Sequence, residues 1–578
     1  MKRNHYLMNI SLLAVLIPFT LVFTSCADFD EINTSKTKKI LDPNSLISGD
    51  DGGTSDEADA WDNVFSYTEA ELTEIAKIDE QANFRNFSYE GVYNDYQRTT
   101  NLFHDFYSGY FANNKPSFNN STPNYAYNDG WMSNRWQHFY QDRMKEYRLL
   151  SKKLKGVDHA SGKYKNAYYI TQIHMCFLAS LMTDTYGDIP FSIFLDKEDP
   201  SVMVYDTQQK VYDLLFKRLT TAAKNIVPGT SAFKFTDNAD NCYNGDEDKW
   251  RKFANTLRLR LALRISNVDP ERAKTEGEAA IAAGLMTSNS DNMKTVPLNF
   301  FGNGGNENVH ALVGFMWMDV CMSKDMEEHY YNQTFQNRLD PRCKKLWFKP
   351  TPYDLLSQGI EDDDPELKYT GRYCGEDSPE HSSENVSILK SKGSILDDDY
   401  WWSYKQESIW LGYSECNFLL AEAALRNWNG TTRSVKEYFE EGIRQSMLYY
   451  KINNEEILDY ISNLKIYYNG GDPFATGSRE TQLEQIITQK WLAVFPNGAE
   501  GWAEFRRTDY PRLHDVAKNV SEDVANGTFI KRIQYPVSEH DNNYMNIPEN
   551  DRQDKKLWWD VAETNSSPFT RAQPNNFR

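Results

Sequence analysis

The segment QLEQIITQKWLAVF, residues 482–495, carries the clearest helical pattern in this chain of 578 residues. Apolar and long side chains recur in steps of three and one at Leu483, Ile486, Ile487, Lys490, Trp491, Val494 and Phe495. Such spacing places them on one face of an α-helix. A helix with one apolar stripe must bury that stripe against a neighbour, so the segment predicts a fold built from packed helices.

The same periodicity recurs along much of the chain, with signals for helix starts. Asp206 and Gln209 have the spacing of a capping box, which predicts a helix that begins near Thr207. Asp269 before Pro270 is a cap followed by a first-turn proline, which predicts another helix start. Further helices are predicted over residues 61–80, 88–110, 130–155, 163–186, 249–267, 311–333, 408–427 and 433–450.

The order of these helices predicts the fold class. They follow one another in neighbouring pairs and alternating strand patterns are scarce, which favours a mainly α fold of stacked helical hairpins. No clean repeat of about 34 residues is present, so a tetratricopeptide-like stack would be degenerate. Over residues 341–404 the helical signal disappears and Pro, Gly, Asp and Ser accumulate among aromatic residues. We therefore predict a long irregular region with a functional role there.

The first residues have the composition of an export signal. Lys2 and Arg3 precede a short apolar stretch that ends in small residues before Cys26, which predicts a secretory signal peptide over residues 1–25. Cys26 then resembles the acylated cysteine of a bacterial lipoprotein, the alternative being a free cysteine near a cleavage site. We expect a lipidated cysteine with a flexible tether over residues 26–55, and a single domain over 56–578.

Composition excludes several classes of function. The chain has 83 acidic and 63 basic residues and a net charge of −20, which argues against nucleic acid as a partner. A neutral or cationic ligand is compatible with that charge. Beyond Ser25 no apolar run approaches the roughly 20 residues that a spanning helix needs. We therefore expect the lipid to be the only link to the membrane.

The seven cysteines are too few for a disulfide scaffold. Those within apolar helical patterns are interpreted as small buried residues: Cys176, Cys321 and Cys416. Those in turn-rich stretches leave a disulfide open: Cys242, Cys343 and Cys374. Acidic stretches at residues 237–248, 362–364 and 397–399 could collect calcium, but none matches an EF-hand loop and solvated loops are favoured. No metal site or cofactor is predicted.

No segment matches GxSxG, HExxH, a Walker A loop or a Rossmann glycine fingerprint, so we predict that the protein is not an enzyme. Asp184 and Asp188 could be imagined as the two carboxylates of a glycosidase. Gly187 and Pro190 beside them favour a turn that ends a helix instead.

Five segments together carry a family resemblance. They are LMTDTYGDIPFS at 181–192, GDEDKWRKFANTLRLRLALRIS from Gly245, YSECNFLLAEAALRN from Tyr413, ITQKWLAVFPNGAEGWAEFRRTDYP from Ile487 and RIQYPVSE from Arg532. The set resembles the SusD/RagB family of surface lipoproteins, in particular its SusD-like branch. The resemblance implies four degenerate tetratricopeptide-like hairpins with an irregular ligand-facing region. It also implies an outer-membrane, surface-exposed protein that captures glycans for a SusC-like TonB-dependent transporter.

Charged residues in these segments are interpreted as packing elements. The simplest account of Arg258, Arg260 and Arg264 is that they hold carboxylates of neighbouring helices. A second cluster suits cation–π contact and charge pairing between helices: Trp491, Trp502, Arg506 and Arg507 with Glu500 and Glu504.

For ligand binding, the aromatic residues of the 341–404 region are the best candidates. A sugar ring has an apolar face that packs on indole or phenol, while its hydroxyls need polar partners nearby. The predicted ligand-binding residues are Trp347, Tyr369, Arg372, Tyr373, Trp401 and Trp402. The competing interpretation is that these residues anchor the loop to the helices.

Three functions compete on this sequence. The first is a non-catalytic surface receptor that delivers oligosaccharides to a transporter. The second is a receptor in the same system whose cargo is a peptide. The third is a secreted all-α glycosidase that uses Asp184.

Overall fold

The computed structural model describes residues 67–93, 95–196, 203–236, 239–297, 309–349, 368–378, 393–401, 406–470, 472–562 and 576–577. Residues Thr54–Arg578 form one compact unit. The predicted signal peptide, the predicted lipidation of Cys26 and the predicted tether lie outside the described residues. So do Trp402 and the acidic stretch at residues 362–364.

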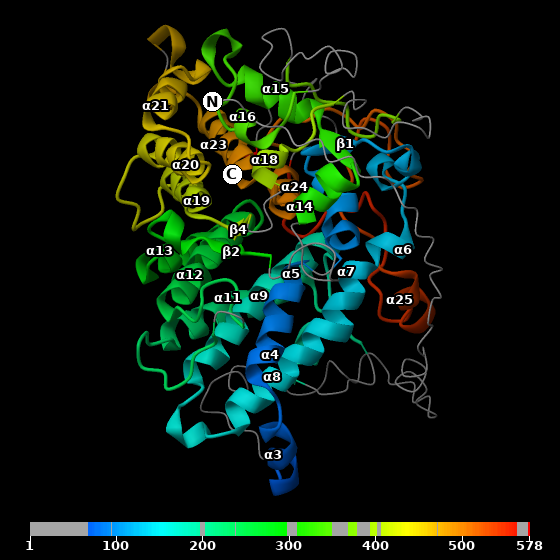
Figure 1. The fold of residues 1–578 in the computed structure, drawn as a ribbon, viewed down its shortest axis with the longest axis vertical. Coiled ribbons are helices and arrows are strands. Elements are labelled where there is room, and N and C mark those ends of the chain that lie inside the picture. The colour runs from blue at the N-terminus through cyan, green and yellow to red at the C-terminus, as the bar shows by residue number, and fades with distance from the viewer. Residues whose placement is uncertain are drawn as a thin grey trace, which may run out of the picture. The chain divides into compact units, whose positions relative to one another are not determined.

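Helices dominate the described chain, which confirms the predicted mainly α fold (Figure 1). The longest are α8 (Met144–Gly156), α9 (Lys165–Tyr186), α11 (Gln208–Asn225), α12 (Glu247–Arg264), α13 (Pro270–Ala283), α19 (Tyr413–Leu425), α20 (Val435–Tyr449) and α23 (Arg479–Val494). Each packs against the next in this order, except that α19 packs against α12 where the order passes from α13 to α19. Figure 1 follows this succession from cyan α8 through green α12 to yellow α19 and α20. Successive helices therefore bury their stripes against one another.

Shorter helices fill the spaces around this succession. They are α3 (Glu69–Ala76), α4 (Glu80–Arg85), α5 (Gly91–Tyr93), α6 (Asp129–Met132), α7 (Asn134–Gln137), α10 (Ser192–Asp196), α14 (Val309–Ala311), α15 (Lys324–Asn332), α16 (Cys343–Leu346), α18 (Asp398–Trp401), α21 (Asn454–Ser462), α22 (Pro473–Thr476), α24 (Gly498–Thr508) and α25 (Val537–Asn542). Wider π-helical turns are η2 (Asn86–Glu90), η3 (Gln97–Asp105), η6 (His138–Arg143) and η9 (Leu312–Met316).

Sequence signals for helix starts are largely confirmed. Asp269 caps α13 by accepting a hydrogen bond from the Arg272 backbone N at 3.2 Å. The helix near Thr207 begins as predicted, but its cap is Thr207, whose hydroxyl accepts from the Lys210 backbone N. The predicted capping box at Asp206 is therefore wrong. That carboxylate instead accepts from the Ser192 backbone N at 2.5 Å and so ties two loops together.

Two predicted helices contain strands. Residues Val320–Met322 form β3, which pairs antiparallel with β1 (Phe111–Asn113), so Cys321 lies in a strand and not in a helix. Residues Ser408–Leu411 form β4, which pairs antiparallel with β2 (Met293–Thr295). A short apolar run has no period that distinguishes a buried strand from a buried helix, so the partner strand decides. The predicted helices 311–333 and 408–427 are wrong over these strands.

The arginines of α12 bind carboxylates on three other helices, as predicted. Arg258 donates to Glu276 of α13 at 2.7 Å, and Arg260 donates to Glu415 of α19 at 2.8 and 2.6 Å. Arg264 reaches α24, where it donates to Glu500 at 2.6 Å and to Glu504 at 2.5 Å. Charge pairs thus join α12 to α13, α19 and α24, with bidentate geometry at Glu415.

Lys490 completes this network from α23. Its Nζ lies 2.8 Å from Glu500 and 3.2 Å from Glu415, and all these side chains are buried. Burial alone would raise the pKa of Glu500, but Arg260, Arg264 and Lys490 outweigh it and lower the pKa to about 2. The carboxylate therefore stays ionised at neutral pH.

The predicted cation–π contact of this cluster forms, but within α24 and not between helices. The guanidinium carbon of Arg506 lies 3.5 Å from the centre of the Trp502 ring, and its Nη1 donates to the Lys531 carbonyl at 2.9 Å. Both side chains are buried. The cation–π contact therefore lies within α24, and the hydrogen bond to Lys531 joins α24 to the C-terminal segment.

Candidate functional site

The region over residues 341–404 is anchored to β3 by backbone hydrogen bonds where the structure describes it. Lys324 N donates to the Arg372 carbonyl at 2.7 Å, and Met322 N donates to the Ser394 carbonyl at 2.7 Å. Trp347 forms a further bridge with Leu396. The described pieces of the predicted irregular region thus include the short helices α16 and α18 and are attached to the fold by isolated β-bridges.

Three of the predicted ligand-binding residues are buried. Trp347 and Trp401 are 1% and 2% exposed, and the Trp401 indole donates to the Leu346 carbonyl at 3.0 Å. Arg372 is also buried and donates to the Asn113 carbonyl at 2.9 Å and to the Asp377 carbonyl at 2.8 Å. These side chains are engaged within the fold, and their role in ligand binding stays a prediction.

Tyr369 and Tyr373 lie closer to the surface. Tyr369 is partly buried against the core, whereas Tyr373 is 43% exposed. The Tyr373 ring meets the His514 ring edge-on, with centroids 5.2 Å apart, and His514 Nε2 lies 3.1 Å from a Glu328 oxygen. Tyr373 is therefore an exposed ring on a polar support, a setting that suits a sugar face.

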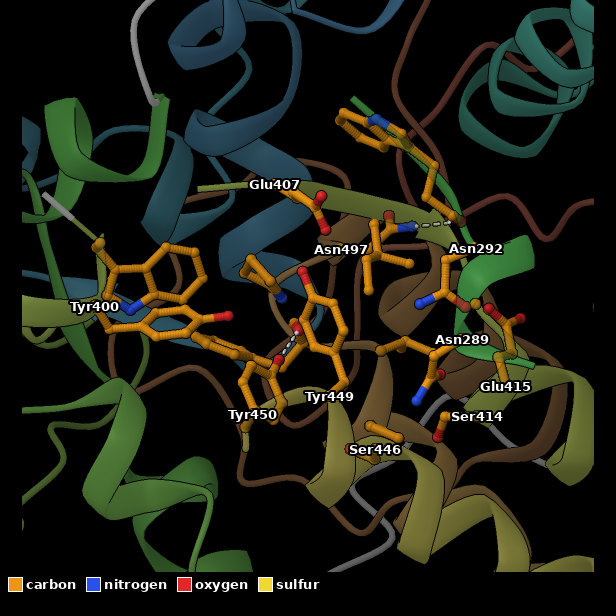
Figure 2. Close-up of a pocket in the computed structure, with 18 residues that line it drawn as sticks. Asn289, Asn292, Tyr400, Glu407, Ser414, Glu415, Ser446, Tyr449, Tyr450 and Asn497 are labelled. Atoms are coloured by element: carbon orange, nitrogen blue, oxygen red, sulfur yellow. Dashed lines mark hydrogen bonds between the residues drawn. The ribbon is translucent and has the colours of Figure 1, made fainter. Parts of the chain in front are cut away.

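An aromatic cleft lies where β4, the end of α20 and the turn between α23 and α24 meet (Figure 2). Its rim is formed by partly buried residues: Asn289, Tyr400, Glu407, Ile409 and Tyr449. Its floor is formed by buried rings: Trp401, Trp410, Tyr450 and Phe495. In Figure 2 the labelled tyrosines lie on one side and the amides of Asn289, Asn292 and Asn497 lie on the other.

Each wall of the cleft is fixed by contacts within the fold. The Trp410 indole donates to the Thr295 hydroxyl at 2.9 Å, and Tyr450 donates to the Phe495 carbonyl at 3.2 Å. Asn497 donates to the Trp410 carbonyl at 3.1 Å. The floor is therefore preorganised, which lowers the entropy cost of binding.

The rim keeps both polar and aromatic character. Burial, together with Tyr450 and Tyr449, raises the pKa of Tyr400, so its hydroxyl stays protonated at neutral pH. Glu407 forms an ion pair with Lys294, which holds its carboxylate at the mouth. The cavity itself holds only about 40 Å³, room for a few waters. A larger ligand would therefore contact the rim and not enter the floor.

The sequence identified one member of this cleft, Trp401, and missed the others. Tyr449 ends a helix, Trp410 lies in a strand, and Asn289 comes from a turn more than a hundred residues earlier. Only the assembled fold, in which β4 pairs with β2 and packs against α23 while α19 packs against α20, brings them together. No signal in the separate segments indicates this cleft.

Asp184 and Asp188 have structural roles at the end of α9. Asp184 accepts hydrogen bonds from the Tyr212 hydroxyl at 2.6 Å and the Trp559 indole at 2.9 Å. Asp188 accepts from the Gln208 backbone N at 2.8 Å, and Gly187 has φ +89°. The turn interpretation is confirmed, and a glycosidase pair at these residues has no support in this geometry.

Three cysteines for which the sequence allowed a disulfide are free thiols in the structure: Cys242, Cys343 and Cys374. Burial raises the pKa of all three, so they stay protonated at neutral pH. Within the described ranges, no three His, Cys, Asp or Glu side chains are grouped as a metal ion would require. None of the described helices combines the length and the apolar character needed to cross a membrane.

Comparison with solved structures finds close likeness of fold. A chitin-binding SusD homolog from Flavobacterium johnsoniae is 28% identical, with a TM-score of 0.67 over 83% of this chain and 98% of that one. A chitin-binding protein is 25% identical, with a TM-score of 0.67 over 83% and 99%. A SusD homolog from Parabacteroides distasonis is 27% identical, with a TM-score of 0.69 over 85% and 99%.

Comparison with curated proteins finds no match. The family model of SusD-like proteins, described as SusD and RagB outer membrane lipoproteins, matches residues 72–560. That range holds all five segments that carried the resemblance. The chain belongs to the SusD-like family of outer membrane lipoproteins.

Proposed function

We propose that the protein binds oligosaccharides at the cell surface without altering them and delivers them to a SusC-like TonB-dependent transporter. The observation that carries this proposal is the aromatic cleft in a member of the SusD-like family. Its rim pairs tyrosine rings with an amide and a carboxylate. Rings pack on the apolar faces of sugars, and the polar groups bind hydroxyls.

We select the candidate ligand-contacting residues by the exposure of their side chains. Asn289, Tyr400, Glu407 and Tyr449 at the rim are partly accessible, and Tyr373, outside the cleft, offers a further exposed ring. Trp401 supports the rim from below. We retain Trp347, Tyr369, Arg372 and Trp402 as predictions of the 341–404 region.

Chitin oligosaccharides are the first ligands to test. Two of the similar structures, at 28% and 25% identity, are described as chitin-binding. The acetamido group of such a sugar has a donor and an acceptor, which the Asn289 amide can match. An uncharged ligand also suits a chain with a net charge of −20.

Attachment to the membrane is proposed through Cys26. Acylation there would place a short tether, residues 27–55, between the lipid and the folded chain. Family membership supports an outer-membrane lipoprotein, and the transporter partner is proposed on the same ground. Radiolabelled palmitate incorporation that is lost in Cys26→Ala would test the anchor.

A competition experiment distinguishes a glycan cargo from a peptide cargo. A glycan array and a peptide library are screened with the soluble form that begins at Ala27. We expect saturable binding to a defined glycan, and unlabelled peptide should leave it unchanged. Selective binding to peptides with no glycan signal would replace the proposal with the peptide-receptor alternative.

A further inference from the structure

A second hollow lies at the opposite end of α20 from the aromatic cleft, where the chain connects α19 to α20. It is an open groove of about 510 Å³, against about 40 Å³ for the cleft. Its walls include Asn427, Trp428, Thr431, Arg433, Ser434 and Phe474. The groove is therefore much roomier than the cleft and lined by amides, hydroxyls, a cation and rings.

The α19–α20 connection, which forms one wall of the groove, is held in place by contacts with α13. It spans the nine residues 426–434 between Leu425 and Val435. Its Trp428 packs on Gly277 of α13 so closely that a Cβ at Gly277 would lie 2.1 Å from the ring. Asn429 donates to a Glu278 oxygen from its backbone N at 2.8 Å and from its side chain at 3.0 Å. Such a connection is preorganised for binding.

The far wall of the groove is fixed by α22. Lys436 donates to Asp472 at 2.8 Å, and the Phe474 ring lies 4.9 Å from the Phe439 ring. The groove therefore has one wall from the α19–α20 connection and one from α22, and neither depends on the ligand for its position.

Arg433 leaves its donors available to a ligand. Its side chain is exposed, and its guanidinium carbon lies 5.9 Å from the Tyr438 ring. Asn427, also exposed and at φ +57°, lines the same groove. A guanidinium supplies donors in a fixed fork, and an amide supplies both donors and acceptors. Together they match the hydroxyl and acetamido groups of a sugar.

We propose that this groove is a second carbohydrate site that holds one sugar unit through Arg433 and Asn427, an inference that rests on the proposed glycan-binding function. α20 has 15 residues, so the groove and the cleft lie roughly 20 Å apart along its axis. Two sites at fixed spacing raise the affinity for a polymer without raising it for a short oligomer.

The test compares the unchanged protein with four variants, all in the form that begins at Ala27. The groove variant is Asn427→Ala with Arg433→Ala, the cleft variant is Tyr400→Ala with Tyr449→Ala, and the third variant combines all four. The matched control is Arg338→Ala, an exposed arginine remote in sequence from both sites. Binding of N-acetylchitotriose is followed by saturation-transfer NMR, and binding to insoluble chitin by depletion from solution.

The cleft variant should keep a weak saturation-transfer signal that the combined variant loses. The groove variant should bind insoluble chitin about tenfold more weakly than the control while its affinity for the triose stays within about twofold. The groove site is overturned if the groove variant binds the polymer as the control does, or if the cleft variant gives no signal. Absence of any binding by the unchanged protein would instead remove the glycan-binding function itself.

Discussion

Arg507 of α24 binds Glu422 of α19 through two hydrogen bonds, 2.8 Å from Nη1 to Oε1 and 2.7 Å from Nη2 to Oε2. Both side chains are fully buried, and Arg507 also donates to Glu504 at 2.7 Å. The pair joins two segments that carried the family resemblance. Its role is therefore to hold helices together and not to bind ligand.

Removing one partner of that pair should destabilise the fold strongly. Glu422→Gln leaves the buried Arg507 charge without its bidentate partner, which typically costs about 3–5 kcal/mol of unfolding free energy. Chemical denaturation measures the change. The control is Asp459→Asn, which breaks an exposed pair with Arg338 and should cost less than about 1 kcal/mol. Equal effects at both sites would contradict a structural role for the buried network.

Gly277→Ala should destabilise the protein, although alanine ordinarily favours a helix. The new Cβ would lie 2.1 Å from the Trp428 ring, so the ring or the helix must move. Overpacking of this kind costs about 1–3 kcal/mol. Gly130→Ala is the control, because its Cβ would meet no atom closer than 3.4 Å. A melting temperature unchanged in Gly277→Ala would show that the α19–α20 connection is not held as described.

Asp105 should make stability depend on pH. Burial raises its pKa to about 7 from an ordinary 3.8, although Asn101 and Tyr96 donate to it. Its stabilising protonated form is fully present below pH 3.8, and the contribution is lost as pH rises to about 7. Relative to Asp105→Asn, the unchanged protein should lose roughly 4 kcal/mol over that interval. Parallel curves for the two proteins from pH 4 to 8 would contradict the raised pKa.

Two of the six predicted binding residues, Trp401 and Tyr373, should differ in how much their truncation changes the stability of the fold. Trp401→Ala removes a buried ring and should cost about 3–5 kcal/mol of stability. Tyr373→Ala acts at the surface and should change stability by less than about 0.5 kcal/mol. Any loss of glycan binding in Tyr373→Ala would thus report contact with ligand. If Trp401→Ala leaves stability unchanged, the tryptophan is not part of the packed floor.

Helical periodicity could predict most of the fold, because a stripe such as Leu483 to Val494 is a local property of the chain. It failed where a short run pairs with a distant strand. The apolar run from Val320 to Met322 is compatible with a helix or a strand. It forms a strand because it pairs with Phe111 to Asn113, some two hundred residues earlier. The arginine series of α12 could be assigned to packing because cations among leucines need buried partners.

The sequence could predict the type of residue that forms the site, but not which residues of that type are exposed. Aromatic residues in an irregular region indicate contact with sugars, but whether an indole faces solvent or the core depends on its neighbours in space. Trp401 is covered because Leu346 and His310 pack around it, whereas Tyr449, which no sequence signal singled out, reaches the rim. Exposure is a property of the assembled fold.

Isothermal titration of N-acetylchitohexaose into four proteins tests the central claim most directly: the unchanged protein, Tyr400→Ala, Tyr449→Ala and the control Tyr544→Ala, whose ring is 67% exposed. Loss of a ring that stacks on a sugar should weaken binding about tenfold in each rim variant and leave the control unchanged. The recovered sugar should be intact. Equal affinity in all four proteins would contradict glycan capture at the aromatic cleft.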